Sequence, residues 1–194
     1  MTIKVLGVGS SMREGSFSTA ALNIALGFSK HQGAETNLLD LRKTQLPMFY
    51  SQEQKTREIQ EVTNHVKWAD AFLLATPDYH GSMSGSMKNF LDYFWSDFAG
   101  KLFGYMCASH EKGLTVMDQM RTAVRQCYGW SLPYGVSLNG EEDFENNQIT
   151  NQKLKSRLEM LSGDLVTYGE LLRGQFLKDL KGNSSNTFAS HYRK

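Results

Sequence analysis

Hydrophobic positions along this chain repeat with two different periods that alternate from the N-terminus onward. Short, nearly continuous apolar runs are followed by longer segments in which apolar residues recur every three or four positions. The first pattern predicts buried strands, and the second predicts amphipathic helices. The predicted strands are Ile3–Val8, Thr36–Leu41, Ala71–Thr76, Leu102–Ala108 and Leu132–Leu138. The predicted helices are Ser18–His31, Thr56–Trp68, Met83–Phe94, Leu114–Tyr128 and Thr150–Leu172.

The alternation of strands and helices predicts the fold class. Right-handed crossovers between consecutive strands give a parallel, doubly wound α/β sheet with helices on both faces. The run Ala71–Thr76 is apolar throughout, as expected for a strand that is covered on both faces. Pro133 cannot donate to a sheet ladder, so the fifth strand belongs at an edge. We therefore expect five strands in the order 2-1-3-4-5, with a ligand at the loops after strands one, three and four.

The length of the chain fits one such domain. Its 194 residues contain no internal repeat and no linker-like segment that would divide them. The last helical pattern ends at Leu172, and small polar residues gather at Gly182–Asn186. We expect a single domain over residues 1–172, followed by a loose C-terminal extension over residues 173–194.

Composition and charge exclude several classes of function. The hydrophobic fraction of 40% and the charged fraction of 21% are ordinary for a globular protein. A formal net charge of +1 gives no electrostatic footprint for nucleic acid or for an anionic membrane surface. No apolar run is long enough to span a bilayer, and no signal peptide precedes the first strand, so a cytoplasmic location is the default expectation. Cys107 and Cys127 lack metal-ligand spacing and are interpreted as free, buried thiols.

The loop after the first predicted strand offers hydroxyl groups, glycines and one arginine just before a helix begins. Free backbone N–H groups and the positive end of the helix dipole make such a position an anion site. Phosphate oxygens can accept hydrogen bonds from Ser11, Ser16, Ser18 and, with charge assistance, Arg13. A polar turn before a helix capped by Ser18 is the alternative interpretation, because serine and glycine are common in both.

The loop after the third predicted strand offers the wall of a small-ligand site. Pro77 sets the direction of the chain, so that Tyr79, His80 and Gly81 project toward the crevice. From the residue types alone, a flavin wall, another small-ligand wall and a plain surface turn remain open.

Two motifs resemble those of the NADPH-dependent FMN reductase family. The segment Thr76–Asp92 is similar to that family's T-P-[ED]-Y-[NH]-G-S…G-x-[LM]-K-N-x-[LI]-D motif, and Ser11–Ser18 is similar to its S-x-R-x-x-S-x-[NS] loop. The resemblance follows the order of elements over most of residues 3–172. It implies a flavodoxin-like fold, non-covalently bound FMN, and NADPH or NADH as the co-substrate.

The resemblance also implies a role for individual residues. The FMN phosphate is expected at four residues of the first loop: Ser11, Arg13, Ser16 and Ser18. The ribityl chain and the isoalloxazine are expected at Pro77, Tyr79, His80 and Gly81. The family forms dimers and often tetramers, so Lys88 and Asp92 are expected in salt bridges between subunits, which makes the Met83–Phe94 helix the interface.

Three positions depart from the family's pattern. Ser10 replaces a glycine, and His80 stands where asparagine is frequent. The third loop, Ser109–Gly113, replaces a glycine-rich loop, and its backbone N–H groups, from Ser109 to Gly113, are expected to stabilise negative charge near flavin N1. His110 in this loop is a candidate proton donor, although a solvated histidine is the more common case.

The predicted chemistry is hydride transfer from NAD(P)H through FMN to a small acceptor such as a flavin, a quinone, an azo compound or a metal ion. No side chain is assigned as catalytic, because the reaction takes place at flavin N5. The isolated His31, His65 and His191 suggest no metal site. The alternatives are a flavodoxin-type electron carrier and an FMN-binding sensor without NAD(P)H turnover.

Overall fold

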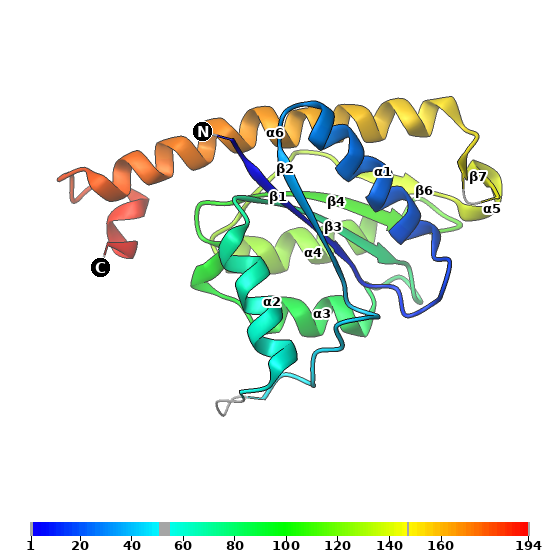
Figure 1. Ribbon diagram of the computed structural model, residues 1–194, viewed down its shortest axis with the longest axis horizontal. Helices are drawn as coiled ribbons and strands as arrows, with labels where there is room; N and C mark the ends of the chain where they lie inside the picture. The colour runs from blue at the N-terminus through cyan, green and yellow to red at the C-terminus, as the bar shows by residue number, and fades with distance from the viewer. Residues whose placement is uncertain (1, 51–54, 147, 194) are drawn as a thin grey trace.

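The computed structural model describes residues 2–50, 55–146 and 148–193 and contains the predicted parallel sheet (Figure 1). The strand order is β2-β1-β3-β4-β5, and β6 also pairs with β4, so the predicted order is confirmed. The sheet strands are β1 (Lys4–Gly9), β2 (Glu35–Asp40), β3 (Ala71–Pro77), β4 (Leu102–Ala108), β5 (Trp130–Ser131) and β6 (Val136–Leu138). A separate antiparallel pair consists of β7 (Phe144–Glu145) and β8 (Gln148–Ile149).

Helices cover both faces of the sheet, as the alternation of elements predicts. The helices are α1 (Phe17–His31), α2 (Arg57–Trp68), α3 (Gly85–Asp92), α4 (Leu114–Gln126), α5 (Gly140–Asp143) and α6 (Gln152–Lys181), with 3-10 turns η1 (Ser96–Phe98) and η2 (Phe188–Tyr192). Neighbouring residues of a strand point to opposite faces. Leu73 of β3 belongs to the apolar cluster that includes residues of α1 and α6, whereas Phe72 and Leu74 belong to the cluster that includes residues of α2, α3 and α4. The core therefore has two halves, one on each side of the sheet.

Two short strands form the edge of the sheet beside β4, and of the two only β6 lies within the strand predicted over Leu132–Leu138. β5 pairs with the start of β4, and β6 pairs with its end, so both occupy the same edge. Pro133 lies between them, in a segment that leaves the ladder. The edge position predicted from Pro133 is confirmed, and the continuous strand predicted over Leu132–Leu138 is wrong because proline interrupts the pairing.

The last helix continues to Lys181, beyond its predicted end at Leu172, and then the chain turns back to form η2 (Figure 1). Phe176 is the apolar anchor of this extension: it is buried against Ala99 and Ala189. Arg193 donates hydrogen bonds to the carbonyl oxygens of Asp179 and Leu180, which lie at the end of α6. No helix in the described ranges is long and apolar enough to cross a membrane.

A buried lysine lies at the end of the sheet where β4 begins. Lys101 is 5% exposed, and its ammonium donates to the carbonyl oxygen of Val66, 2.8 Å away, near the end of α2. Burial, assisted by the nearby positive charge of Arg173, lowers the pKa of Lys101 from 10.5 to about 8. The folded protein therefore releases this proton at a lower pH than the unfolded chain does.

This lysine makes stability depend on pH. Between pH 8 and pH 10.5 the unfolded chain binds more protons at this position, so the contribution of Lys101 to stability rises with pH. We expect wild type to gain about 2 kcal/mol in unfolding free energy relative to Lys101→Met between pH 7 and pH 10. Urea unfolding of both proteins across this range measures the difference, and parallel stability curves would refute the assignment.

Candidate functional site

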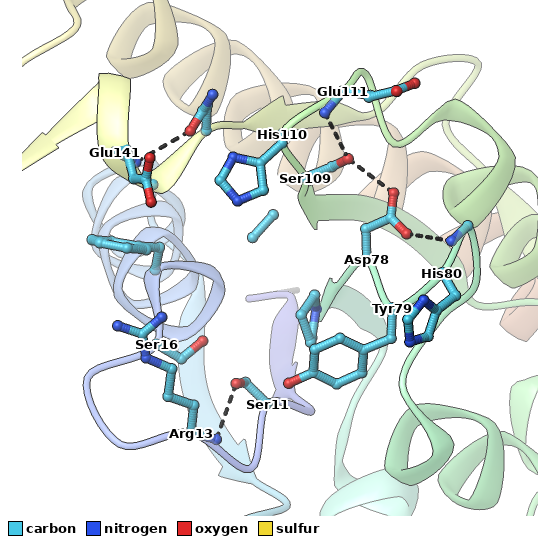
Figure 2. A pocket seen from close by; sticks show the side chains of 16 residues that line it. Ser11, Arg13, Ser16, Asp78, Tyr79, His80, Ser109, His110, Glu111 and Glu141 are labelled. Carbon is cyan, nitrogen blue, oxygen red and sulfur yellow. Dashed lines mark hydrogen bonds between the residues drawn. The ribbon is translucent and has the colours of Figure 1, made fainter.

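A cavity of about 540 Å³ opens where β1, β3 and β4 end (Figure 2). The loops after these three strands form it, at the edge of the sheet where doubly wound folds bind ligands. Eight residues that the sequence predicts for the site line this cavity: Ser11, Arg13, Ser16, Pro77, Tyr79, His80, Gly81 and Ser109. Two other predicted residues, Ser18 and Gly113, do not line it.

The first wall of the cavity is the start of α1. Ser16 is the N-cap residue, and no side chain among the described residues caps the helix there. The first turn contains no acidic residue, so the helix itself supplies no carboxylate to offset its positive potential. Ser18, predicted as the cap, instead lies inside the helix, fully buried, with its hydroxyl 2.8 Å from that of Ser16. Ser18 therefore does not face the cavity, and its buried hydroxyl orients that of Ser16.

Arg13 lies at the same side of the cavity, held by its own loop. Its backbone N–H donates to the Oγ of Ser11 at 3.2 Å, and its guanidinium lies over the ring of Phe17, 5.8 Å from the ring centroid. Phe17 in turn packs against Phe144, with 5.3 Å between the ring centroids. Arg13 is thus placed on an aromatic support beside the open helix end, which suits it to bind an anion.

The opposite wall is a tight hairpin turn after β3. Tyr79 and Ser82 exchange two backbone hydrogen bonds of 2.9 and 3.1 Å across it. His80 and Gly81 between them both have positive φ angles, 56° and 75°, which is the type I′ arrangement. None of the described residues has an atom within 4 Å of where a Gly81 Cβ would lie. The turn therefore presents backbone, with little side-chain bulk, to the cavity.

Gln119 of α4, which sequence reasoning did not single out, holds this turn from outside. Its Oε1 accepts from the hydroxyl of Ser82 at 2.8 Å, and its Nε2 donates to the carbonyl oxygen of Gly81 at 3.1 Å. Tyr79 keeps 49% of its surface exposed at the cavity. The wall is consequently rigid in its backbone while its aromatic ring remains accessible.

The third loop differs from the prediction in one respect. The backbone N–H groups of Ser109 and Glu111 are already used, since they donate to the Leu138 carbonyl oxygen and to the Oγ of Ser109. The N–H groups of Ser109 and Glu111 are therefore not free to stabilise negative charge on a flavin, contrary to the prediction. Gly113 begins α4 with a positive φ of 56°, and a Cβ there would lie 2.8 Å from the Sγ of Cys107. Glycine at this position serves close packing, beside a second cavity that adjoins the first.

The short helix α5 completes the cavity, and the sequence did not predict it. Asn139, Gly140 and Glu141 line the cavity, and Gly140 lies against the ring of Phe17. The side chain of Asn139 caps α5 by accepting from the N–H of Glu141, and the carboxylate of buried Asp143 accepts from the N–H of Asn139 at 2.7 Å. An asparagine followed by acidic residues is a recognised helix start, and that signal was available in the sequence.

In the described ranges, no group of three or more histidine, cysteine or acidic residues is placed to hold a metal ion. His110 of the third loop also lines the cavity. The cavity thus lies between the start of α1 with Arg13 on one side and the backbone turn with Tyr79 on the other.

Comparison with known proteins agrees with this geometry. The model of the family described as NADPH-dependent FMN reductase matches residues 3–143. The chain belongs to this family. The match ends with α5, so the family region contains every loop of the cavity, while α6 and η2 follow it.

Individual relatives show the extent of the similarity. An NADPH azoreductase of Bacillus sp. (strain OY1-2) is 33% identical over 55% of this chain and 62% of its own length. An NAD(P)H-dependent FMN reductase of Pseudomonas aeruginosa is 34% identical over 47% of this chain and 49% of its own length. This chain thus aligns with less than two thirds of either relative. The solved structure of the NAD(P)H:(acceptor) oxidoreductase FerB from Paracoccus denitrificans, 15% identical, shares the fold with a TM-score of 0.74, covering 88% of this chain and 98% of FerB.

Both departures from the FMN reductase motifs in the first two loops have a structural explanation. Histidine, like asparagine, tolerates positive φ better than most residues, so His80 preserves the turn. Ser10, in place of glycine, is fully buried and donates from Oγ to the carbonyl oxygen of Ala75. Its Oγ also accepts from that of Ser84 at 2.8 Å. Ser10 therefore adds a link between the phosphate-loop candidate and the start of α3.

Ser84 lies at the centre of this buried network, so its removal should be costly. Its Oγ caps α3 by accepting from the N–H of Met87, and it donates to Ser10. We expect Ser84→Ala to reduce the free energy of unfolding by about 2 kcal/mol, from the lost cap and the unpaired groups left behind. Ser156→Ala, at an exposed position of α6, is the control and should change stability little. Equal urea midpoints for the two variants would contradict the role given to Ser84.

Proposed function

We propose that this protein is an FMN-dependent oxidoreductase that transfers hydride from NADPH or NADH, through bound FMN, to a small acceptor. The observation that carries the proposal is the cavity, which joins an uncapped helix start and Arg13 on one side to the rigid Tyr79–Ser82 turn on the other. Family membership and the names of the relatives support the same activity.

The residues present fit FMN, and each is proposed for one part of it. The phosphate is bound by Ser11, Arg13 and Ser16 at the start of α1, with Ser18 behind them. The ribityl chain and the isoalloxazine are bound by Pro77, Tyr79, His80, Gly81 and Ser109, with Gly113 in support. The volume of about 540 Å³ lies within the range of cofactor sites. Bound FMN supplies the hydride chemistry, and the side chains orient it and bind its charges.

The open cavity bears on the choice of acceptor. Tyr79 is half exposed, and no side chain is assigned to proton transfer, so small acceptors of several kinds have access to the same face. We propose a flavin, a quinone, an azo compound or a metal ion as the acceptor. The net charge of +1 disfavours the alternative of a flavodoxin-type carrier, because carriers that dock on protein partners usually present a strongly acidic surface.

Anaerobic mixing tests this proposal against its alternatives. The purified full-length protein is loaded with FMN and mixed with NADPH or NADH, and absorbance near the flavin maximum is followed. Bleaching within seconds, reversed when a quinone is added, is the expected result. A yellow protein that neither nucleotide bleaches would instead be a carrier or a sensor. A protein that does not take up FMN would contradict all three functions.

We also propose an assembly, a domain division and a location. The helix predicted over Met83–Phe94 is proposed as the interface of a homodimer or homotetramer, since a largely apolar groove lies between α3 and α4. Within one subunit Lys88 and Asp92 already pair at 2.5 Å on the exposed face of this helix, so an intersubunit salt bridge requires exchange of partners.

Residues 1–172 are proposed as the FMN-binding domain and residues 173–194 as its extension. A cytoplasmic location suits a consumer of NAD(P)H.

A further inference from the structure

Asp78 connects the two loops that face each other across one end of the cavity (Figure 2). One carboxylate oxygen accepts from the backbone N–H of Gly81 at 2.8 Å, inside the turn after β3. The other accepts from the hydroxyl of Ser109 at 2.8 Å, in the loop after β4. That hydroxyl in turn accepts from the N–H of Glu111 at 3.1 Å. A single side chain therefore sets the spacing of both loops.

The backbone of Asp78 is held as firmly as its side chain. Its N–H donates to the carbonyl oxygen of Ala108 at 2.8 Å, directly beyond the last paired residues of β3 and β4. Both oxygens and the backbone of Asp78 are thus held by hydrogen bonds, and Asp78 is among the residues that line the cavity. A fixed negative charge is thus present where the ring of the proposed cofactor would lie.

The negative charge of Asp78 raises the pKa of a neighbouring thiol. Burial raises the pKa of the Cys107 thiol to about 12, and the negative charge of Asp78 adds to that effect. Cys107 lies in β4 beneath the third loop. A second anion formed on the cavity side of Asp78 would be disfavoured for the same electrostatic reason.

Resting on the function proposed above, we propose that Asp78 is a positioning residue that joins the two flavin-facing loops and lowers the reduction potential of bound FMN. Hydride transfer from NAD(P)H adds two electrons and one proton to oxidised FMN and leaves NAD(P)⁺, so the flavin ring becomes negatively charged. The carboxylate of Asp78 disfavours that charge, and reduced FMN becomes a stronger donor toward the acceptor.

Two substitutions separate the hydrogen bonds from the charge. Asp78→Asn keeps both contacts, because the amide oxygen accepts from Gly81 and the amide nitrogen donates to the Ser109 hydroxyl, which has two lone pairs. Asp78→Ala removes the contacts together with the charge. Ser109→Ala is the complementary variant, because it loses the link between the loops and keeps the charge.

The expected results differ for each variant of the FMN-loaded, full-length protein. For Asp78→Asn, the preference for reduced over oxidised FMN rises about tenfold, which for a two-electron couple is about +30 mV in midpoint potential. Asp78→Ala and Ser109→Ala should each weaken FMN binding about tenfold, and only the former should change the potential. An Asp78→Asn potential equal to that of wild type, or unchanged FMN affinity in Asp78→Ala, would overturn the proposal.

Amide hydrogen exchange in the flavin-free protein gives a readout that does not depend on the proposed activity. Exchange at Gly81 and Glu111 should be faster in Asp78→Ala than in wild type, and near wild type in Asp78→Asn. If wild type fails to bind FMN while this exchange pattern holds, the proposed function fails and the positioning role stands. If wild type binds FMN while the exchange rates are equal in all three proteins, the positioning role alone is refuted.

Discussion

Replacement of Arg13 by alanine is expected to weaken FMN binding by about 10- to 100-fold, the loss typical of a hydrogen bond to a charged group. Arg13 is the charged side chain that stands beside the uncapped start of α1, and its aromatic support holds it there in the absence of ligand. Because the guanidinium is exposed, its loss should leave the fold intact. Titration of the flavin-free protein with FMN, followed by fluorescence quenching, measures the change.

Two further variants make the Arg13 result specific. Arg13→Lys keeps the charge but loses the planar, forked donor, so its affinity should fall between those of wild type and Arg13→Ala. Arg57→Ala removes an exposed arginine at the start of α2, outside the cavity, and should bind FMN as wild type does. If Arg13→Ala and Arg57→Ala bind FMN equally well, Arg13 has no part in the site.

The second large effect is expected at Gly140, where α5 meets α1. A Cβ at this position would lie 1.9 Å from the Cδ2 of Phe17, and that ring already packs against Phe144 and beneath Arg13. We expect Gly140→Ala to lower the free energy of unfolding by about 1–3 kcal/mol, as overpacked positions do. FMN affinity should fall as well, because the displaced ring moves the support of Arg13. Thermal unfolding and FMN titration measure the two effects.

A control glycine substitution and a compensating double variant test whether the clash with Phe17 causes the loss of stability. Gly174→Ala lies in α6, where no described residue has an atom within 4 Å of the new Cβ, so helix propensity should make it more stable by up to about 1 kcal/mol. The double variant Phe17→Leu with Gly140→Ala should recover part of the stability, because the smaller side chain leaves room. Additive losses in the double variant would show that the clash is not the cause.

The fold could be predicted where one residue pattern filled a whole element. The apolar runs of β3 and β4 and the periodic helices along the chain indicate a doubly wound sheet, and the predicted strand order is confirmed. The pattern could not predict where an element ends when tertiary contacts determine that end. The edge strand is broken because Pro133 cannot pair with β4. The continuation of α6 to Lys181 depends on the packing of Phe176 against Ala99.

The site was predictable where its residues follow a strand directly in sequence. Ser11 and Arg13 after β1, and Tyr79 and His80 after β3, are brought together by the topology alone. The wall formed by α5 was missed, because four helical residues carry no periodic signal and the segment reaches the cavity only after β6 has ended. The roles of Gln119 and Asp78 depend on hydrogen bonds between loops, for which a single sequence has no pattern.

The division of the edge into β5 and β6 affects how the protein behaves at high concentration. A long, regular outer strand offers unpaired N–H and C=O groups to which a strand of another molecule can add, and this is a common route to aggregation. Here the outer edge has two stretches of two and three residues, and the segment between them contains Pro133, which has no N–H. Too few adjacent groups remain to seed such an added strand, so this side of the molecule is protected against sheet-to-sheet polymerisation.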